Sequence, residues 1–161
     1  DFYYTDLYKT FTGLTQKYGI APGNLNLEIT ETALMSDLQH HMETLTRLQD
    51  YGFVIELDDF GSGYSSLNML KDITADVLKI DMLFLRETEH TVRNRIILQS
   101  VISMAKQLGM AVITEGVETE EQLESLKKMG CELFQGYYFS RPIAVEEFEQ
   151  KYIGGAAGKK A

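Results

Sequence analysis

The sequence predicts an α/β fold with a largely parallel sheet, and three observations support this. Short aliphatic runs alternate along the chain with longer stretches of helical periodicity, which is the pattern of repeated βαβ units. Four of the helical stretches end at a glycine, namely Gly19, Gly52, Gly109 and Gly130, and glycine commonly lies just past a helix C-terminus. The length of 161 residues fits one domain with a hydrophobic core.

The aliphatic runs are the predicted strands. They cover residues 25–30, 53–57, 77–80, 111–114 and 133–134. Their brevity and lack of alternation are typical of strands buried on both faces of a parallel sheet. Periodicity alone does not separate such a strand from a buried helical turn.

Three helices are predicted from apolar residues at helical spacing. Their apolar faces are Leu38, Met42, Leu45 and Leu48; Val92, Ile96, Ile97, Val101, Met104 and Leu108; and Leu123, Leu126 and Met129. Ser36 with Gln39, and Thr119 with Gln122, have the spacing of capping boxes at the start of the first and third helices.

Composition limits the partners that the chain is expected to have. Acidic residues outnumber basic ones 24 to 15, for a formal charge of -9, which argues against binding to a nucleic acid polymer. No apolar run approaches the roughly 20 residues that cross a bilayer, so no direct membrane insertion is expected. A single cysteine, Cys131, fits a reducing compartment, and we expect a cytoplasmic protein with Cys131 as a buried apolar side chain.

The histidines and the C-terminal residues are not expected to take part in a functional site. We expect His40, His41 and His90 to lie at the surface, since they occur in polar or charged stretches. Residues 154–161 contain only Gly, Ala and Lys and are expected to form a flexible tail.

Polar residues follow the predicted strands, where a parallel α/β fold places its active site. They are Glu28 and Glu31, Asp58 and Asp59, Lys79 and Asp81, Glu115 and Glu118, and Gln135. Carboxylates gathered at one edge repel one another unless cations neutralise them, and such oxygen-rich sites suit Mg²⁺ or Mn²⁺. Acidic residues are frequent enough here for some of these placements to arise by chance. The pair Asp58-Asp59 is harder to explain in this way, because burying it is costly unless it is solvated or metal-bound.

Several of these residues could have structural roles instead of binding a metal. Glu31 could be a favourable charge in the first turn of a helix, Lys79 could pair with Asp81, and Gln135 could be a turn residue. The stretch from Phe60 to Leu67 is weak as a phosphate loop, because it lacks the glycine spacing and lysine of the known fingerprints.

Taken together, five segments resemble the EAL domain family of cyclic di-GMP phosphodiesterases. The matching motifs are Leu27-Glu28-Ile29-Thr30-Glu31, residues 58–67 (DDFGSGYSSL), Lys79-Ile80-Asp81, Glu115-Gly116-Val117-Glu118-Thr119, and Gln135-Gly136-Tyr137 followed by Arg141-Pro142. They occur in the family's order and span nearly the whole chain, which makes the combination far more specific than any single motif.

The resemblance implies roles for these residues. Glu28 and Asp58 would be metal ligands, Asp59 would bind a second metal, and Glu115 would help to hold metals and water. Lys79 would contact the attacking water or the phosphate, and Lys79, Glu115 and Asp59 would form the catalytic set. A supporting set would hold the substrate and the loop after Asp59; it comprises Glu31, Ser62, Gly63, Asp81, Glu118 and Gln135.

The resemblance also implies an activity, a fold and a set of partners. The activity would be Mg²⁺- or Mn²⁺-dependent hydrolysis of cyclic di-GMP to linear pGpG. The fold would be a TIM-like (β/α)8 barrel, of which residues 1–153 supply about five of the eight units. The family's Glu-Ala-Leu strand and the next strand, with its Asn metal ligand, are not found in the sequence. We therefore expect weakened metal binding, self-association through an exposed barrel edge, and an upstream sensor or cyclase domain in a longer parent protein.

Two alternatives to this activity are weighed. The chain could be a catalytically impaired module of the same fold that binds the nucleotide or another protein. It could also be another metal-assisted barrel enzyme, one that abstracts a proton next to a carboxylate with a lysine base.

Overall fold

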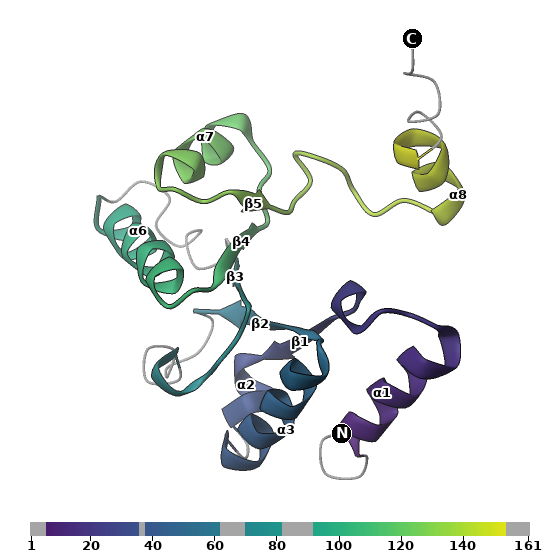
Figure 1. Ribbon diagram of the computed structural model, residues 1–161. Coiled ribbons are helices and arrows are strands. Elements are labelled where there is room, and N and C mark those ends of the chain that lie inside the picture. Colours follow the sequence, from purple (N-terminus) through teal and green to yellow (C-terminus); the bar gives the residue numbers. More distant parts are fainter. Residues whose placement is uncertain (1–5, 36–37, 62–69, 82–91, 154–161) are drawn as a thin grey trace.

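The computed structural model describes residues 6–35, 38–61, 70–81 and 92–153, and these form the predicted α/β fold. Five parallel strands lie in chain order in a single sheet (Figure 1). They are β1 (Asn26–Thr30), β2 (Val54–Phe60), β3 (Val77–Asp81), β4 (Ala111–Glu115) and β5 (Leu133–Phe134). Each overlaps a predicted run, and β2 continues three residues further than expected.

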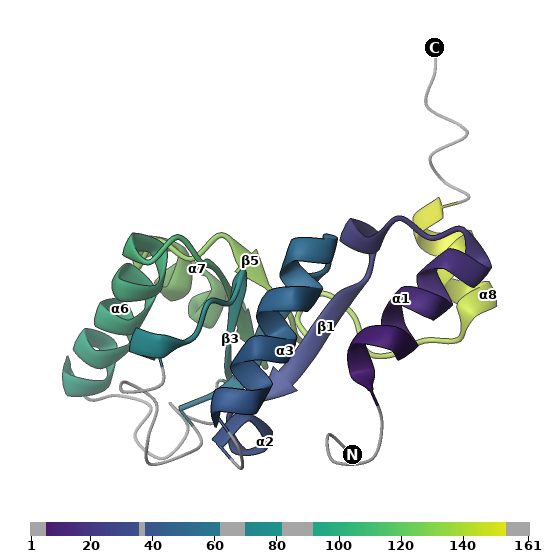
Figure 2. The same cartoon turned by 60° about the horizontal axis from the view of Figure 1, so that its bottom comes forward.

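Helices precede and connect the strands. They are α1 (Leu7–Tyr18), α2 (Glu31–Met35), α3 (Leu38–Tyr51), α6 (Val92–Gln107), α7 (Glu120–Lys128) and α8 (Val145–Phe148), with short helical turns η1 (Pro22–Asn24) and η2 (Glu149–Ile153). Figures 1 and 2 show α3, α6 and α7 along one side of the sheet, while the segment after β5 leads away from them to α8. No helix among the described residues is both long and apolar enough to cross a membrane.

The two faces of the sheet differ in polarity. Side chains alternate between the faces along each strand, and residues in register on parallel strands share a face. The apolar face packs against the helices and contains Ile55, Leu57 and Leu78, none of which is exposed. The opposite face, called the inner face below, carries the polar strand residues Asn26, Glu28, Glu56, Asp58, Lys79, Asp81 and Glu115.

A β-bulge interrupts this alternation in β2. Leu57 pairs with Leu78 and Phe60 pairs with Ile80, so two residues of β2 oppose the single residue between them on β3. The second of the two, Asp59, has a left-handed backbone with φ 56°, a conformation that aspartate tolerates better than most residues. The bulge keeps Phe60 in the core and allows consecutive aspartates to lie near the inner face.

The helix ends follow the sequence signals closely. Thr119 accepts a hydrogen bond from the Gln122 backbone N–H, and the Gln122 side chain accepts one from the Thr119 backbone N–H, which confirms the capping box of α7. The four predicted helix-ending glycines all have positive φ. Ser36 lies outside the described residues.

The prediction that His41 lies at the surface is wrong. His41 is completely buried, and its Nδ1 lies 3.0 Å from the carbonyl oxygen of Leu34. The reason is that the start of α3 packs against α2, a contact that the polar neighbours of His41 in the sequence do not reveal. Cys131, by contrast, is buried as expected.

The predicted apolar face of α6 is also largely wrong. The buried residues of this helix are Leu98, Ile102 and Ala105, whereas Val92 and Ile96 are exposed. Apolar side chains occur around most of this helix, so periodicity alone could not choose the side that meets the sheet.

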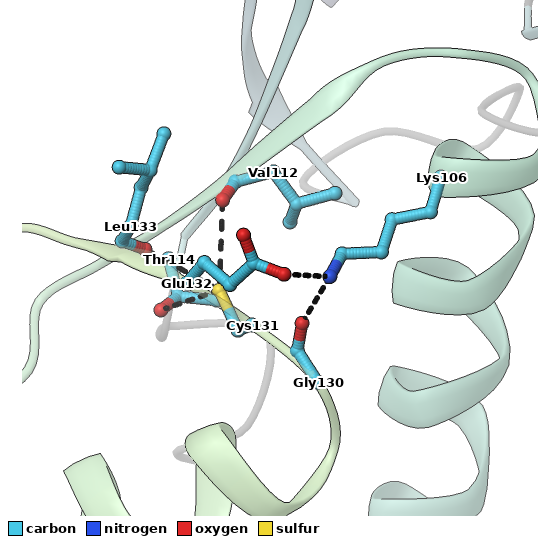
Figure 3. A network of polar contacts seen from close by, with 7 residues as sticks. All are labelled: Lys106, Val112, Thr114, Gly130, Cys131, Glu132 and Leu133. Carbon is cyan, nitrogen blue, oxygen red and sulfur yellow. Dashed lines mark hydrogen bonds and ion pairs between the residues drawn. The ribbon is translucent and has the colours of Figure 1, made fainter.

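A polar contact fastens α6 to the turn that precedes β5 (Figure 3). The ammonium group of Lys106 donates to the Gly130 carbonyl oxygen and lies 2.8 Å from Glu132 Oε1. Beside it, Cys131 Sγ lies 3.5 Å from the Val112 carbonyl oxygen. This contact lies at the amino-terminal edge of the sheet, away from the carboxyl ends of the strands.

Candidate active site

Three carboxylates from three different strands meet at the ammonium group of Lys79. Lys79 Nζ lies 2.8 Å from Glu28 Oε1, 3.3 Å from Asp58 Oδ1 and 2.9 Å from Glu115 Oε1. The Lys79 side chain is only 6% exposed, whereas that of Glu28 is 53% exposed. The cluster therefore has a buried cation at its centre and opens to solvent beside Glu28.

Strand register accounts for this convergence. Lys79 lies on β3 opposite the bulge of β2, so it faces Asp58, and Asp81 pairs with Glu115 on β4. Glu28 lies on β1, whose register continues the same polar face. The structure thus places these side chains together toward the carboxyl-terminal ends of the strands.

Asp59 is close enough to the cluster to respond to its charges. Burial raises the pKa of the Asp59 carboxyl above its ordinary value, and the negative charges of Asp58 and Asp81 raise it further, against the opposing effect of Lys79. Placing a second aspartate here is thus unfavourable for folding, and neutralising its charge with a cation would remove that cost.

The pKa values of the buried pair reflect the same competition. Burial raises the pKa of Glu115, and the hydrogen bond and charge of Lys79 only partly offset this. Burial opposes the charged form of Lys79, but hydrogen bonds to Glu28 and Glu115 outweigh it and hold the pKa of Lys79 above its ordinary value. Lys79 is therefore a permanent cation at neutral pH.

The supporting residues predicted from sequence are more dispersed. Glu31 is buried in the first turn of α2, which begins directly after β1. Glu118 and Gln135 are exposed; the Glu118 backbone N–H donates to Gln122 Oε1 at the start of α7. Ser62 and Gly63 lie outside the described residues, and so does the loop that Glu31 was expected to support.

The main chain at Gln135 joins two segments at the carboxyl edge of the sheet. Its carbonyl oxygen accepts from the Val117 N–H, and the Val117 carbonyl oxygen accepts from the Tyr138 N–H. Gly136 packs so closely here that a Cβ atom would collide with the Val117 backbone. The close approach explains a glycine at this position.

One polar pair of the inner face escaped the sequence analysis. Asn26 Nδ2 donates to Glu56 Oε1 at 2.6 Å, and Glu56 is only 5% exposed. The signal was available, because Asn26 and Glu56 lie two residues before Glu28 and Asp58 and so share their face of the sheet. The pair extends the polar lining away from the strand ends.

The donor set suits a hard divalent cation, although its present arrangement is centred on lysine. Glu28, Asp58 and Glu115 offer carboxylate oxygens, the ligands that Mg²⁺ and Mn²⁺ favour. In the part of the chain that the structure describes, no three His, Cys, Asp or Glu side chains are grouped as metal ligands around one point. The three carboxylates are instead turned toward Lys79 Nζ.

Comparison with known proteins finds relatives of similar sequence. The cyclic di-GMP phosphodiesterase NbdA of Pseudomonas aeruginosa is 43% identical over 145 residues, which are 88% of this chain and 18% of the relative. The cyclic di-GMP phosphodiesterase RocR of the same organism is 35% identical over 142 residues, 88% of this chain and 36% of the relative. The chain thus spans roughly a fifth to a third of these proteins.

Solved structures give the same result for the fold. The PaMucR phosphodiesterase in its c-di-GMP complex superposes with a TM-score of 0.83 at 35% identity, covering 91% of this chain and 60% of that one. The manganese and cyclic di-GMP complex of Klebsiella pneumoniae BlrP1 has a TM-score of 0.80 at 32% identity, covering 88% and 36%. The five-stranded sheet is accordingly part of a TIM-like barrel. The model of the EAL domain matches residues 4–142, and the chain belongs to the EAL domain family.

Proposed function

We propose that this site hydrolyses one phosphodiester bond of cyclic di-GMP, giving linear pGpG, with the help of Mg²⁺ or Mn²⁺. The observation that carries the proposal is the meeting of Glu28, Asp58 and Glu115 at Lys79, on the motifs of the EAL domain family. Relatives at 35–43% identity are named as phosphodiesterases for this nucleotide.

The chain's own residues fit the electrostatics of this reaction. A phosphodiester is anionic, so its oxygens repel an incoming nucleophile. Lys79 holds a permanent positive charge at the carboxyl ends of the strands, where it can attract a phosphate oxygen or orient the attacking water. Rigid strand ends hold the carboxylates in place, as a catalytic cage requires.

Glu28, Asp58 and Glu115 would hold one cation, and Asp59 would contribute to a second. When bound, such cations neutralise the phosphate and lower the pKa of a bound water. The raised pKa of Asp59 is consistent with a carboxylate that gains from a neighbouring cation. The manganese complex of BlrP1 supports the choice of metal.

The site is proposed to reach full activity only within a complete EAL barrel. The chain covers 60% of the PaMucR structure, so the remaining part of such a barrel would complete the cage. We propose that residues 1–153 act as the C-terminal portion of that domain, in the cytoplasm and downstream of a sensor or cyclase domain. The 161-residue chain alone is then expected to hydrolyse cyclic di-GMP slowly.

The test is hydrolysis of cyclic di-GMP by the chain in Mn²⁺, with product separation by chromatography. We expect linear pGpG as the product, no turnover in EDTA, and no turnover by Asp58→Ala. Asp50→Asn is the control, since Asp50 is an exposed aspartate at the end of α3, away from the cluster. Turnover that survives Asp58→Ala would contradict the assignment of the site.

A second candidate function is suggested by the orientation of the carboxylates. Because they are turned toward Lys79 rather than grouped as metal ligands, the chain could bind the nucleotide without hydrolysing it. Calorimetry separates the two functions. Binding of cyclic di-GMP with the same affinity in EDTA and in Mn²⁺, without product, would favour the binding module.

A further inference from the structure

The ammonium group of Lys79 lies among the carboxylates that would bind a divalent cation. The same three oxygens, Glu28 Oε1, Asp58 Oδ1 and Glu115 Oε1, are the closest anionic partners of its ammonium group. A divalent cation bound to these oxygens would lie close to the positively charged ammonium group of Lys79, and the two like charges repel each other. The lysine and the metal therefore compete for one set of ligands.

We propose that Lys79 is a built-in counter-ion, which holds the carboxylates together and sets the affinity of the site for divalent cations by competing with them. Metal binding is then an exchange, in which the ammonium group withdraws from these oxygens as the cation takes them. The proposal rests on the proposed function only in that a divalent cation binds at this cluster.

The charge of the cluster explains why Lys79 stabilises the carboxylates and why a divalent cation is still attracted to them. Five carboxylates lie within electrostatic reach of one ammonium group, a formal charge of −4; they are Glu28, Asp58, Asp59, Asp81 and Glu115. Without Lys79 the carboxylates would repel one another more strongly. With Lys79 alone the cluster keeps a negative charge, so binding of a divalent cation is electrostatically favourable.

The exposure of the three carboxylates indicates which ion pair of Lys79 breaks first. Glu28 is 53% exposed, whereas Asp58 and Glu115 are 19% and 17% exposed. Water can solvate the Glu28 carboxylate as it leaves Lys79, which makes that ion pair the easiest of the three to break. The four-carbon stem of lysine allows its ammonium group to move while the backbone of β3 stays in place.

The first experiment measures Mn²⁺ binding by calorimetry without any nucleotide, using the wild-type chain, Lys79→Met and Lys106→Met. Methionine keeps most of the lysine volume and removes the charge. We expect Lys79→Met to bind Mn²⁺ about tenfold more tightly than wild type. Lys106→Met removes an equally short lysine–glutamate pair at the other edge of the sheet, and its affinity should match wild type. Equal or weaker binding by Lys79→Met, or no binding by any of the three, overturns the proposal.

Thermal unfolding supplies a second readout of the same variants. In EDTA, Lys79→Met should unfold several degrees below wild type, because its carboxylates have lost their counter-ion, and saturating Mn²⁺ should close most of that gap. Lys106→Met should show the same increment on adding Mn²⁺ as wild type. An increment for Lys79→Met no larger than that of wild type contradicts the exchange.

A third measurement needs no variant that might fail to fold. In the wild-type chain with ¹⁵N-labelled lysine, the Lys79 ammonium resonance should shift or disappear as diamagnetic Mg²⁺ saturates the site. An unchanged resonance under Mg²⁺ saturation, verified by calorimetry, overturns the proposal. Its failure is distinguishable from failure of the proposed function, because hydrolysis of cyclic di-GMP is a separate assay and nucleotide is absent here.

Discussion

Asp59 combines a left-handed backbone with a carboxylate whose neighbours oppose its charge. Asparagine has the same shape, tolerates the left-handed region and carries no charge. Asp59→Asn should therefore raise the free energy of unfolding in EDTA by roughly 0.5 kcal/mol, the size of a removed like-charge contact. Asp59→Ala should be about 1 kcal/mol less stable than Asp59→Asn, because alanine resists positive φ. Urea unfolding checks both; equal stability of the two variants would contradict the backbone argument.

The pKa values of the cluster also predict how stability depends on pH. Asp59 and Glu115 have pKa values above their ordinary values of 3.8 and 4.5. The folded chain thus binds more protons than the unfolded chain just above those values, and this contribution to stability falls as the pH rises. Lys79 acts in the opposite range: its raised pKa stabilises the fold at neutral pH, and that contribution is lost only above its ordinary value of 10.5.

The difference between wild type and Asp59→Asn isolates the Asp59 contribution. Urea midpoints measured in EDTA from about pH 4 to about pH 7 should fall more steeply, or rise less, in wild type than in Asp59→Asn. Parallel curves would show that Asp59 keeps its ordinary pKa in the folded chain.

Single residues also mark the limits of the sequence prediction. Glu28, Asp58, Lys79 and Glu115 could be placed together because parallel strands end at a common edge. The burial of His41 could not be predicted, because it depends on how α3 meets α2 across space rather than on neighbours in the chain. Likewise, no sequence rule indicated that the carboxylates would turn toward Lys79.

At the scale of the element, the capping box of α7 was fully predictable because it is a local interaction. Thr119→Ala should lower the free energy of unfolding by about 1 kcal/mol, since it removes the hydrogen bond to the Gln122 N–H. Thr46→Ala is the matched control: its hydroxyl donates to the Met42 carbonyl oxygen within the exposed part of α3, and the loss should stay within about 0.5 kcal/mol. Equal effects of the two substitutions in thermal unfolding would contradict the role of the cap.

The junction after β5 is expected to tolerate no side chain. Gly136→Ala would place a Cβ atom against the Val117 backbone, and we expect a loss of about 2 kcal/mol. Gly13→Ala, in the middle of α1 with open space around it, should instead gain about 0.5 kcal/mol. Chemical denaturation of both variants tests this, and a neutral Gly136→Ala would mean that the junction relaxes easily.

Elements differ in how much of their packing the sequence reveals. The strands were placed closely because aliphatic runs between glycines leave few alternatives. The face of α6 was misjudged because Leu98 and Ile102 are no more apolar than the exposed Val92 and Ile96. Only the position of the helix against the sheet distinguishes them.

At the scale of the whole molecule, β1 and β5 each pair with one strand among the described residues. Open edges favour pairing with other chains, so we expect the chain to self-associate as its concentration rises. Leu133→Lys places a charge on β5, where Leu133 is 48% exposed, and should weaken that association. Leu108→Lys, directly after α6, is a control with similar exposure. Sedimentation of a monomer at all concentrations would contradict the expectation.

The parallel sheet and its order follow from the alternation of strands and helices, so the whole-molecule fold was largely predictable. The barrel could not be inferred from periodicity, because five βα units are compatible with an open sheet or a closed one. That assignment came from the resemblance of motifs and was confirmed by superposition on EAL domains.

The extra residue in β2 has an evolutionary consequence. Because Leu57 and Phe60 keep their partners on β3 on either side of it, removing one aspartate would restore an ordinary ladder without moving any apolar side chain to the wrong layer. The sheet thus does not need the second acid to keep its register. Descendants of such a domain could abandon chemistry here by a single-codon deletion and still fold.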